Sequence, residues 1–169
     1  MSEYNFKTKP YAHQMEALKQ AYNKEYYAFF MEMGTGKSKV LIDEIGGYFL
    51  QGKIDTALII APKGVYRNWE RGEIPTHLSD KIPHTVAAWK APSEMTKDDK
   101  KKLKDIIYPN KTLRILLMNI EALSGSVGIK YVTQFLHKNN TLLAIDESTT
   151  IKTPTASRTK NAIKISKLA

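Results

Sequence analysis

The sequence contains no cysteine. This absence excludes a disulfide scaffold, a zinc site built on thiolates and a cysteine nucleophile, and it favours a reducing compartment. No apolar run approaches the roughly 18 residues that a membrane-spanning helix needs, and the N-terminus lacks the basic start and apolar stretch of a signal peptide. We therefore expect a cytoplasmic protein without a membrane partner, whose chemistry depends on other side chains.

Acidic residues are also comparatively few. The 169 residues carry 26 Lys and Arg against 17 Asp and Glu, which gives a formal net charge of +9. With 42% hydrophobic and 25% charged residues, the composition is that of a globular domain and excludes a disordered or collagen-like chain. The positive charge favours an anionic partner, and nucleic acid is the first candidate. On charge alone, ribosomal, lipid-surface and merely basic proteins stay open.

Short apolar runs alternate with longer segments of helical period along the chain. This order predicts an α/β fold with a mostly parallel central sheet and helices on both faces. The expected strands cover residues 26–31, 56–61, 84–88, 113–118 and 141–146. The expected helices cover residues 12–24, 37–50, 64–75, 97–107, 128–138 and 154–168. The last of these ends without a glycine or proline stop signal, so we expect a fragment, the front part of a longer protein.

A glycine-rich turn joins the first expected strand to the helix that begins at residue 37. It reads Met31-Glu32-Met33-Gly34-Thr35-Gly36-Lys37-Ser38. Phosphate binding needs this order, because glycines let successive backbone amides point inward and the helix N-terminus adds partial positive charge. Lys37 can then reach the β- and γ-phosphates of a nucleotide, and the Ser38 hydroxyl can bind a magnesium ion. The alternative is a tight turn without a ligand, which the flanking strand and helix disfavour.

Two acidic residues follow the last expected strand, where the apolar run 142–145 leads directly into Asp146 and Glu147. At the carboxyl edge of a parallel sheet, such an Asp can hold a magnesium ion through water, and the adjacent Glu can orient or activate an attacking water. Taken alone, the pair could equally begin an acidic helix. With the glycine loop in the same chain, the favoured interpretation is catalytic, with Lys37, Asp146 and Glu147 in catalysis and Ser38 and Asp146 at the metal.

Together these motifs resemble those of the first motor domain of superfamily 2 helicases, specifically the Swi/Snf-type DNA translocases. The motifs appear in the family's order, as the glutamine motif at 9–14, motif I at 32–38, motif Ia at 58–63, the following motif at 119–123 and motif II at 146–147. The resemblance covers nearly the whole chain. It implies that residues 1–169 form an N-terminal RecA-like P-loop NTPase domain that uses ATP and Mg²⁺. Compact relatives of this kind occur in bacteriophages and bacteria, which implies such a source.

The resemblance also implies roles for single residues. Gln14 would read the adenine edge, and the nucleotide would be bound by Met33, Gly34, Thr35, Gly36, Lys37 and Ser38. Ser148 and Thr149 depart from the Ala-His or Gly-His that often follows the acids and helps connect nucleotide state to a second motor domain. Because that second RecA-like domain, with its arginine fingers, is missing here, we expect weak ATP binding and poor hydrolysis from these residues. The full protein would be a DNA-stimulated ATPase.

In this fold, the loops that leave the strands of motif Ia and of the 119–123 motif meet the nucleic-acid backbone. Lys63, Asn119 and Ser124 are therefore candidate contacts to DNA, with double-stranded DNA preferred over single-stranded DNA. Trp69 is expected in the core. The charge run 97–105 is expected to be a solvated helix with one apolar edge. The histidines lie too far apart in sequence to predict a metal site.

Two other functions stay open at this point. A small P-loop phosphotransferase, or kinase, has a similar length and glycine loop but usually closes an arginine-bearing lid over the phosphates. Here the only close pair of arginines, Arg67 and Arg71, follows the second expected strand. The other possibility is a non-catalytic module that binds nucleotide or DNA and regulates a partner. The combination of motifs favours the ATP-hydrolysing motor over both.

Overall fold

The centre of the molecule is a four-stranded parallel sheet in the order β2-β3-β1-β4. The computed structural model describes residues 4–90, 92–147 and 153–169. Its strands are β1 (Thr56–Ala61), β2 (His84–Ala88), β3 (Leu113–Asn119) and β4 (Thr141–Ile145). The predicted α/β class and four of the predicted strands are thereby confirmed. Strand β1 is buried along its whole length because it lies inside the sheet with helices over both of its faces.

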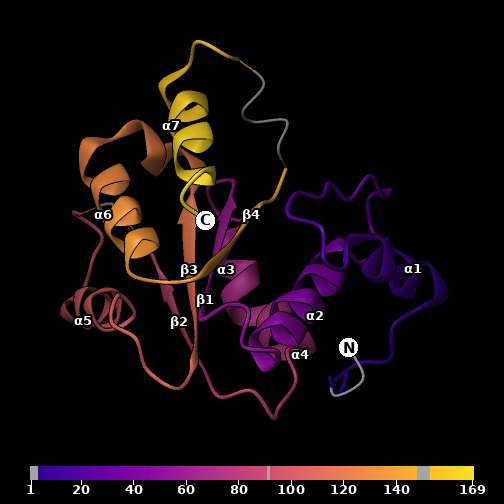
Figure 1. Cartoon of the computed structure of the whole chain (residues 1–169). Coiled ribbons are helices and arrows are strands. Elements are labelled where there is room, and N and C mark those ends of the chain that lie inside the picture. Colours follow the sequence, from indigo (N-terminus) through magenta and orange to yellow (C-terminus); the bar gives the residue numbers. More distant parts are fainter. Residues whose placement is uncertain (1–3, 91, 148–152) are drawn as a thin grey trace.

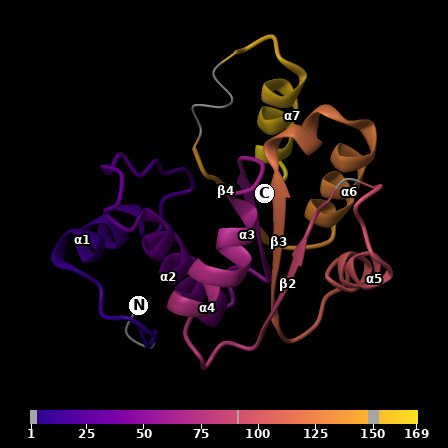
Figure 2. The ribbon, with the colours of Figure 1, turned by 180° about the vertical axis from the view of Figure 1, so that it is seen from behind.

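Helices cover both faces of the sheet, as predicted (Figures 1 and 2). One face carries α2 (Lys37–Leu50) and the consecutive turns α3 (Tyr66–Asn68), η1 (Trp69–Glu73) and α4 (Ile74–His77), with α1 (Ala12–Ala21) packed on α2. The other face carries α5 (Lys97–Asp105), α6 (Ser126–His137) and α7 (Ser157–Ser166). A short 3₁₀ helix, η2 (Ile120–Ser124), follows β3. Each face has its own hydrophobic core.

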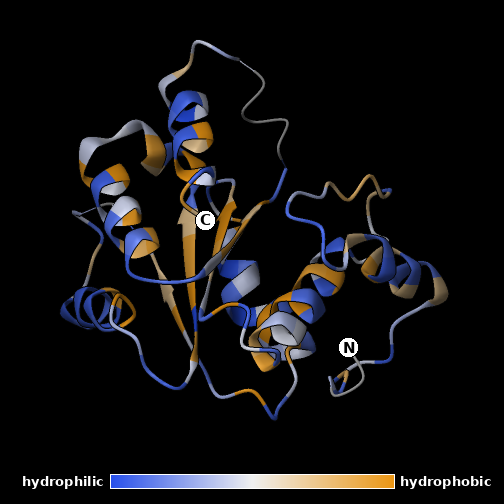
Figure 3. Ribbon diagram, in the orientation of Figure 1, coloured by the Kyte–Doolittle hydropathy of each residue, from blue (hydrophilic) through white to orange (hydrophobic). Residues whose placement is uncertain are grey.

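The alternation of side chains along β1 assigns residues to these two cores. Ala57, Ile59 and Ala61 belong to the core under α2, whereas Leu58 and Ile60 belong to the core under α5, α6 and α7. This is the two-residue period of a strand whose faces are both covered. Hydrophobic residues accordingly gather on the strands, while α5 is mostly hydrophilic, as predicted for its charge run (Figure 3). No described helix combines the length and the apolar character that a membrane span requires.

The helix predicted over residues 64–75 is present but contains a π-helical turn, η1, between α3 and α4. Pro75 lies in the first turn of α4 and has no N–H group to donate to the carbonyl of Arg71. The missing bond accounts for a wider turn at this point, since π-turns arise where the ordinary ladder is interrupted. The turn places Trp69 on the side of the helix that faces the sheet, where it is 2% exposed.

The strand predicted over residues 26–31 is wrong. The structure has no strand between α1 and α2, and the side chains of Tyr26 and Phe30 are 73% and 97% exposed. Local contacts replace a strand ladder here, because the Tyr27 hydroxyl donates to Gln20 of α1 at 2.9 Å and its ring packs edge-on against Phe29. In the described sheet β4 therefore pairs with β1 on one side only.

Candidate functional site

The glycine loop makes a tight turn immediately before α2. Gly34 and Gly36 have φ of 78° and 80°, in the left-handed region that glycine adopts without steric cost. Gly36 is the residue that caps the N-terminus of α2, and the Thr35 hydroxyl closes the turn by donating to the carbonyl of Glu32 at 2.7 Å. Lys37 and Ser38 consequently occupy the first turn of α2, where free backbone amides and the helix dipole favour an anion.

Lys37 lies folded over this loop. Its ammonium group donates to the carbonyls of Met31 and Glu32 at 3.0 and 2.9 Å. An ammonium has three donors, so one N–H stays available to a phosphate oxygen. The Ser38 hydroxyl makes no hydrogen bond within the described residues, and the side chain is half-buried. Both predicted phosphate-site side chains are therefore at the helix N-terminus, where the sequence placed them.

Gln14 brings the first turn of α1 against the glycine loop. Its side-chain amide donates to the carbonyl of Thr35 at 3.0 Å, while its oxygen accepts from the backbone N–H of Tyr11 at 2.9 Å. A Cβ atom at Gly36 would lie 2.4 Å from the Gln14 amide nitrogen, so only glycine allows this approach. The His13 ring also contacts the Thr35 carbonyl at 3.0 Å. The structure thus joins the glutamine motif to motif I, whereas the role of Gln14 towards adenine stays a prediction.

Met33, at the tip of the glycine loop, is exposed. Its assignment to nucleotide binding rests on its position between the two motif residues Glu32 and Gly34. No described contact fixes its side chain.

Asp146 lies at the carboxyl end of β4, as predicted. Its backbone N–H continues the ladder by donating to Ile60 at 2.8 Å, and its carboxylate accepts a 3.0 Å hydrogen bond from the indole N–H of Trp69. Because Leu142 and Ala144 belong to the core under α2, the alternation along the strand directs Asp146 to that same face. The acid and α2 therefore share one face of the sheet.

Trp69 is the residue that the sequence reasoning missed as part of the site. Its core location was predicted and is confirmed, but its hydrogen bond to Asp146 joins residues 77 positions apart. The available signal was the position of Asn68-Trp69 on the helical segment that follows the motif Ia strand. The indole fixes the orientation of the carboxylate, in the way that outer-shell groups orient metal ligands.

Glu147 is exposed and has φ of 52°. The left-handed region costs a non-glycine residue about 1–2 kcal/mol, and such strain is concentrated at functional sites. The backbone therefore leaves the extended conformation of β4 directly after Asp146. Ser148 and Thr149 lie outside the described residues, so the expectation about that position stays untested.

The donors available between α2 and β4 suit a magnesium ion bound together with phosphates. In Figure 1, the loop that enters α2 and the end of β4 lie towards the same edge of the molecule. Within the described ranges, no bond joins Lys37 or Ser38 to Asp146, and no cluster of three or more His, Asp or Glu could hold a metal alone. Magnesium usually takes one or two carboxylates, several waters and substrate phosphates, so one hydroxyl and one carboxylate are a fitting set.

The predicted nucleic-acid contacts lie along the edge of the sheet that carries Asp146. Asn119 pairs in register with Ala61, and Lys63 follows two residues after that strand end. Lys63 and Ser124 are exposed, and Asn119 is half-buried because its side-chain oxygen caps η2 by accepting from the Ala122 N–H at 3.0 Å. The structure brings the three residues to one sheet edge, and their contact with DNA stays a prediction.

A buried ion pair lies in the first two turns of α2. Lys39 donates to Asp43 at 2.6 Å, and the Tyr4 hydroxyl donates to the other Asp43 oxygen at 3.0 Å. Burial raises the pKa of Asp43 above its ordinary value, although Lys39 and Tyr4 both act to lower it. The sequence reasoning missed this group, for which the signal was a Lys–Asp pair at helical spacing inside an apolar helix. The pair ties the N-terminal segment to α2.

Comparisons with known proteins agree with this arrangement. Residues 7–167 match the family described as type III restriction enzyme, res subunit. Among solved structures, the Sulfolobus solfataricus SWI2/SNF2 ATPase core in complex with dsDNA is similar, with a TM-score of 0.56 and 15% sequence identity. That match covers 95% of this chain and 37% of the other, so the chain spans little more than a third of the relative. No curated protein matches the sequence. The likeness confirms the RecA-like fold.

Proposed function

The chain belongs to the family of type III restriction enzyme res subunits, and from this we propose that it is the ATP-binding motor domain of a helicase-type DNA translocase. One observation supports the proposal above all others: the glycine loop at the start of α2 and the Asp146 carboxylate occupy the same face of one parallel sheet. This is the arrangement that a nucleotide triphosphate with a magnesium ion needs, with amides and Lys37 at one end and a metal-binding acid at the other.

The chemistry follows from the positions of the side chains. Lys37 would bind oxygens of the β- and γ-phosphates, and Ser38 and Asp146 would hold the magnesium ion, which neutralises the developing charge. Glu147 would orient a water molecule towards the γ-phosphorus and accept its proton as the bond to the β-phosphate oxygen breaks, releasing ADP and phosphate. Gln14 would contact the adenine, with the glycine loop held in place by the same side chain.

Double-stranded DNA is the proposed partner. The solved relative is described as a complex with dsDNA, and the exposed Lys63 and Ser124 lie at a sheet edge of a chain with net charge +9. Contacts at such an edge would go to the phosphate backbone and carry little sequence information. A second RecA-like domain outside these residues is part of the proposal, supported by the 63% of the relative that this chain does not cover (100 − 37). A cytoplasmic location, in a bacterial or phage-infected cell, is proposed from the lack of cysteine and from the resemblance.

Binding of a fluorescent ATP analogue in the presence of Mg²⁺ tests the nucleotide site. Lys37→Ala should weaken binding at least about tenfold, because a charge-assisted contact to phosphate is worth roughly 1.5–3 kcal/mol. Lys81→Ala, which removes an exposed lysine elsewhere, is the matched control. Equal affinities of the two variants would refute the assignment of the glycine loop.

Turnover in the full-length protein tests the motor. We expect DNA to stimulate ATP hydrolysis, and Glu147→Gln to lower the rate about 10²-fold or more, as for loss of a general base. Binding to DNA should weaken steeply with added salt. Stimulation by a small metabolite but not by DNA would favour the kinase, and an unchanged rate in Glu147→Gln would favour a non-catalytic module. Robust DNA-dependent turnover by residues 1–169 alone would contradict the need for a second domain.

A further inference from the structure

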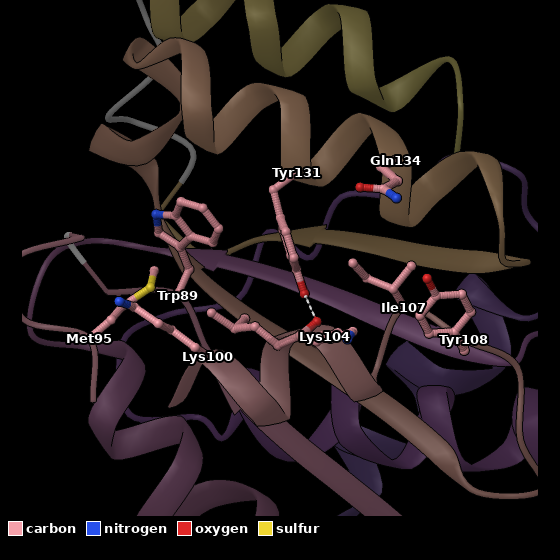
Figure 4. Close-up of a pocket in the computed structure, with 9 residues that line it drawn as sticks. Trp89, Met95, Lys100, Lys104, Ile107, Tyr108, Tyr131 and Gln134 are labelled. Atoms are coloured by element: carbon pink, nitrogen blue, oxygen red, sulfur yellow. Dashed lines mark hydrogen bonds between the residues drawn. The ribbon is translucent and has the colours of Figure 1, made fainter. Parts of the chain in front are cut away.

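An aromatic pocket lies between α5 and α6, on the sheet face opposite to the glycine loop. It is a shallow depression, widely open to solvent, with a volume of about 330 Å³. Figure 4 shows Trp89 at one end, Tyr131 in the middle and Tyr108 at the other end, with lysines of α5 along the border. None of the proposed nucleotide or DNA contacts lines this pocket.

The floor of the pocket is held in place by bonds to the sheet and between the two helices. The backbone N–H of Trp89 donates to Leu117 of β3 at 2.8 Å, and the rings of Trp89 and Tyr131 pack with their centroids 4.9 Å apart. The Tyr131 hydroxyl donates to the carbonyl of Leu103, which joins α6 to α5 (Figure 4). The cavity is therefore preformed, and a ligand would not have to open it.

Below the far end of the pocket, a buried polar clamp fixes the ends of both helices. Arg114, which is 0% exposed, donates to Asn139 at 2.7 Å and to the carbonyl of Ile106 at 3.2 Å. Asn139 in turn donates to the carbonyls of Ile107 and Phe135 at 3.2 and 2.8 Å. These bonds set the spacing between α5 and α6, and with it the width of the pocket.

The border of the pocket is positively charged. Lys100 and Lys104, one turn apart on α5, line the cavity, and neither has an acidic partner within 4.0 Å among the described residues. Two acids of α5 form ion pairs with other lysines. Asp98 pairs with Lys102 at 2.9 Å, and Asp99 pairs with Lys90 at 2.7 Å. The remaining acid of α5, the exposed Asp105, is at helical spacing from Asp98 and Lys102, on the side away from the cavity.

A third cation lies beside Tyr108, at the far end of the pocket. Lys138 of the segment after α6 lies over the Tyr108 ring, with its ammonium 4.5 Å from the centroid. None of the described residues that line the pocket is an Asp or a Glu. The pocket thus combines an apolar, aromatic floor with the cations of α5 along its border and Lys138 beside its far end.

We propose that this pocket binds an acidic segment of a partner protein, with one large apolar side chain seated in the depression against Trp89, Met95 and Tyr131. The carboxylates of the segment pair with Lys100 and Lys104, which leaves the nucleotide face of the sheet uncovered. A small molecule fits less well, because small-molecule sites bury most of their ligand whereas this cavity is open on one side. Base stacking needs an open ring face, but Trp89 is only 8% exposed, and Lys138 already lies over the exposed ring of Tyr108.

Fluorescence anisotropy with a defined probe tests the proposal. The probe is a short fluorescein-labelled peptide in which a central Trp is flanked by Asp and Glu residues. The charge-reversed variant Lys100→Glu with Lys104→Glu should bind it at least about tenfold more weakly than the unchanged chain. Lys19→Glu with Lys81→Glu, which changes the net charge equally at exposed positions on other elements, should stay within about twofold. Thermal unfolding of both variants checks that each is folded.

A second probe tests the apolar anchor separately from the charge. Replacing the central Trp of the peptide by Ser should weaken binding about tenfold, since a buried aromatic side chain contributes in proportion to the apolar area removed from water. Equal binding of the two peptides, or equal loss in the two charge-reversed variants, would overturn the proposal. A single-stranded oligonucleotide that binds more tightly than the peptide and depends on Lys100 and Lys104 would overturn it in favour of nucleic acid.

Discussion

Replacing Trp69 by Phe is expected to change both stability and the orientation of Asp146. The indole is 2% exposed and donates a 3.0 Å hydrogen bond to the carboxylate. Phe keeps most of the aromatic volume but has no N–H group, so the substitution removes this donor with limited change in shape.

The magnitude has two parts. A hydrogen bond to a charged acceptor contributes about 1.5–3 kcal/mol, and because Asp146 is half-buried, water can replace part of it, which leaves about 1–2 kcal/mol. Loss of packing around the missing part of the indole costs about another 1–2 kcal/mol, well below the roughly 3–5 kcal/mol cost of a Trp-to-Ala change. The free energy of unfolding should therefore fall by about 2–4 kcal/mol, which a domain of typical stability survives.

A double-mutant cycle separates the two parts. Urea unfolding of Trp69→Phe, Asp146→Ala and the double variant, followed by far-UV circular dichroism, should give a coupling energy of about 1–2 kcal/mol. In the nucleotide assay, Trp69→Phe should also weaken Mg²⁺-dependent binding by about tenfold or more, as for other outer-shell changes. A coupling energy below about 0.5 kcal/mol would show that the indole does not hold the carboxylate, and the reasoning would then fail.

Two further predictions use matched or single substitutions. In urea unfolding, Gly36→Ala should lower the free energy of unfolding more than Gly34→Ala does. Both glycines have positive φ, but only at Gly36 would the new Cβ meet the Gln14 side chain, at 2.4 Å. Equal decreases in the two variants would mean that the Gln14 contact is absent. Burial raises the pKa of Glu44 from its ordinary 4.5 to about 7, so the folded state binds this proton more tightly than the unfolded state. The free energy of unfolding should then decrease by roughly 3 kcal/mol from this group as pH rises from about 4.5 to about 7. Glu44→Gln should remove that part of the slope in urea titrations at stepped pH, and an unchanged slope would contradict it.

Of the four strands that the sequence predicted correctly, the two inner ones, β1 and β3, are buried almost throughout. Residues 56–61 form a continuous apolar run, and the structure gives β1 the same bounds. The run at 26–31 has similar apolar content, but composition does not reveal whether a neighbouring strand is available, and here contacts with α1 are made instead. The helix at 37–50 has the predicted bounds because Gly36 provides a clear start signal.

The site was predictable in its motifs and less so in its supporting contacts. The positions of Lys37, Ser38 and Asp146 follow from local order, since each lies directly at the end of a strand or the start of a helix. The contact of Trp69 with Asp146 depends on how two distant segments meet, which no local pattern encodes. Lys39 is charged and was therefore not expected in the interior, where its ion pair with Asp43 and its position over the Phe6 ring offset the cost of burial.

The alternating assignment of β1 to two cores restricts how the length of the protein can change. Insertion of one residue within 56–61 would exchange Ile59 and Ile60 between the two layers of helices, and both layers would lose their complementary surfaces at once. Insertions are tolerated instead in the turns beyond the strand ends. Those turns carry Lys63 and Glu147, so changes in chain length are best tolerated next to the proposed DNA and nucleotide contacts.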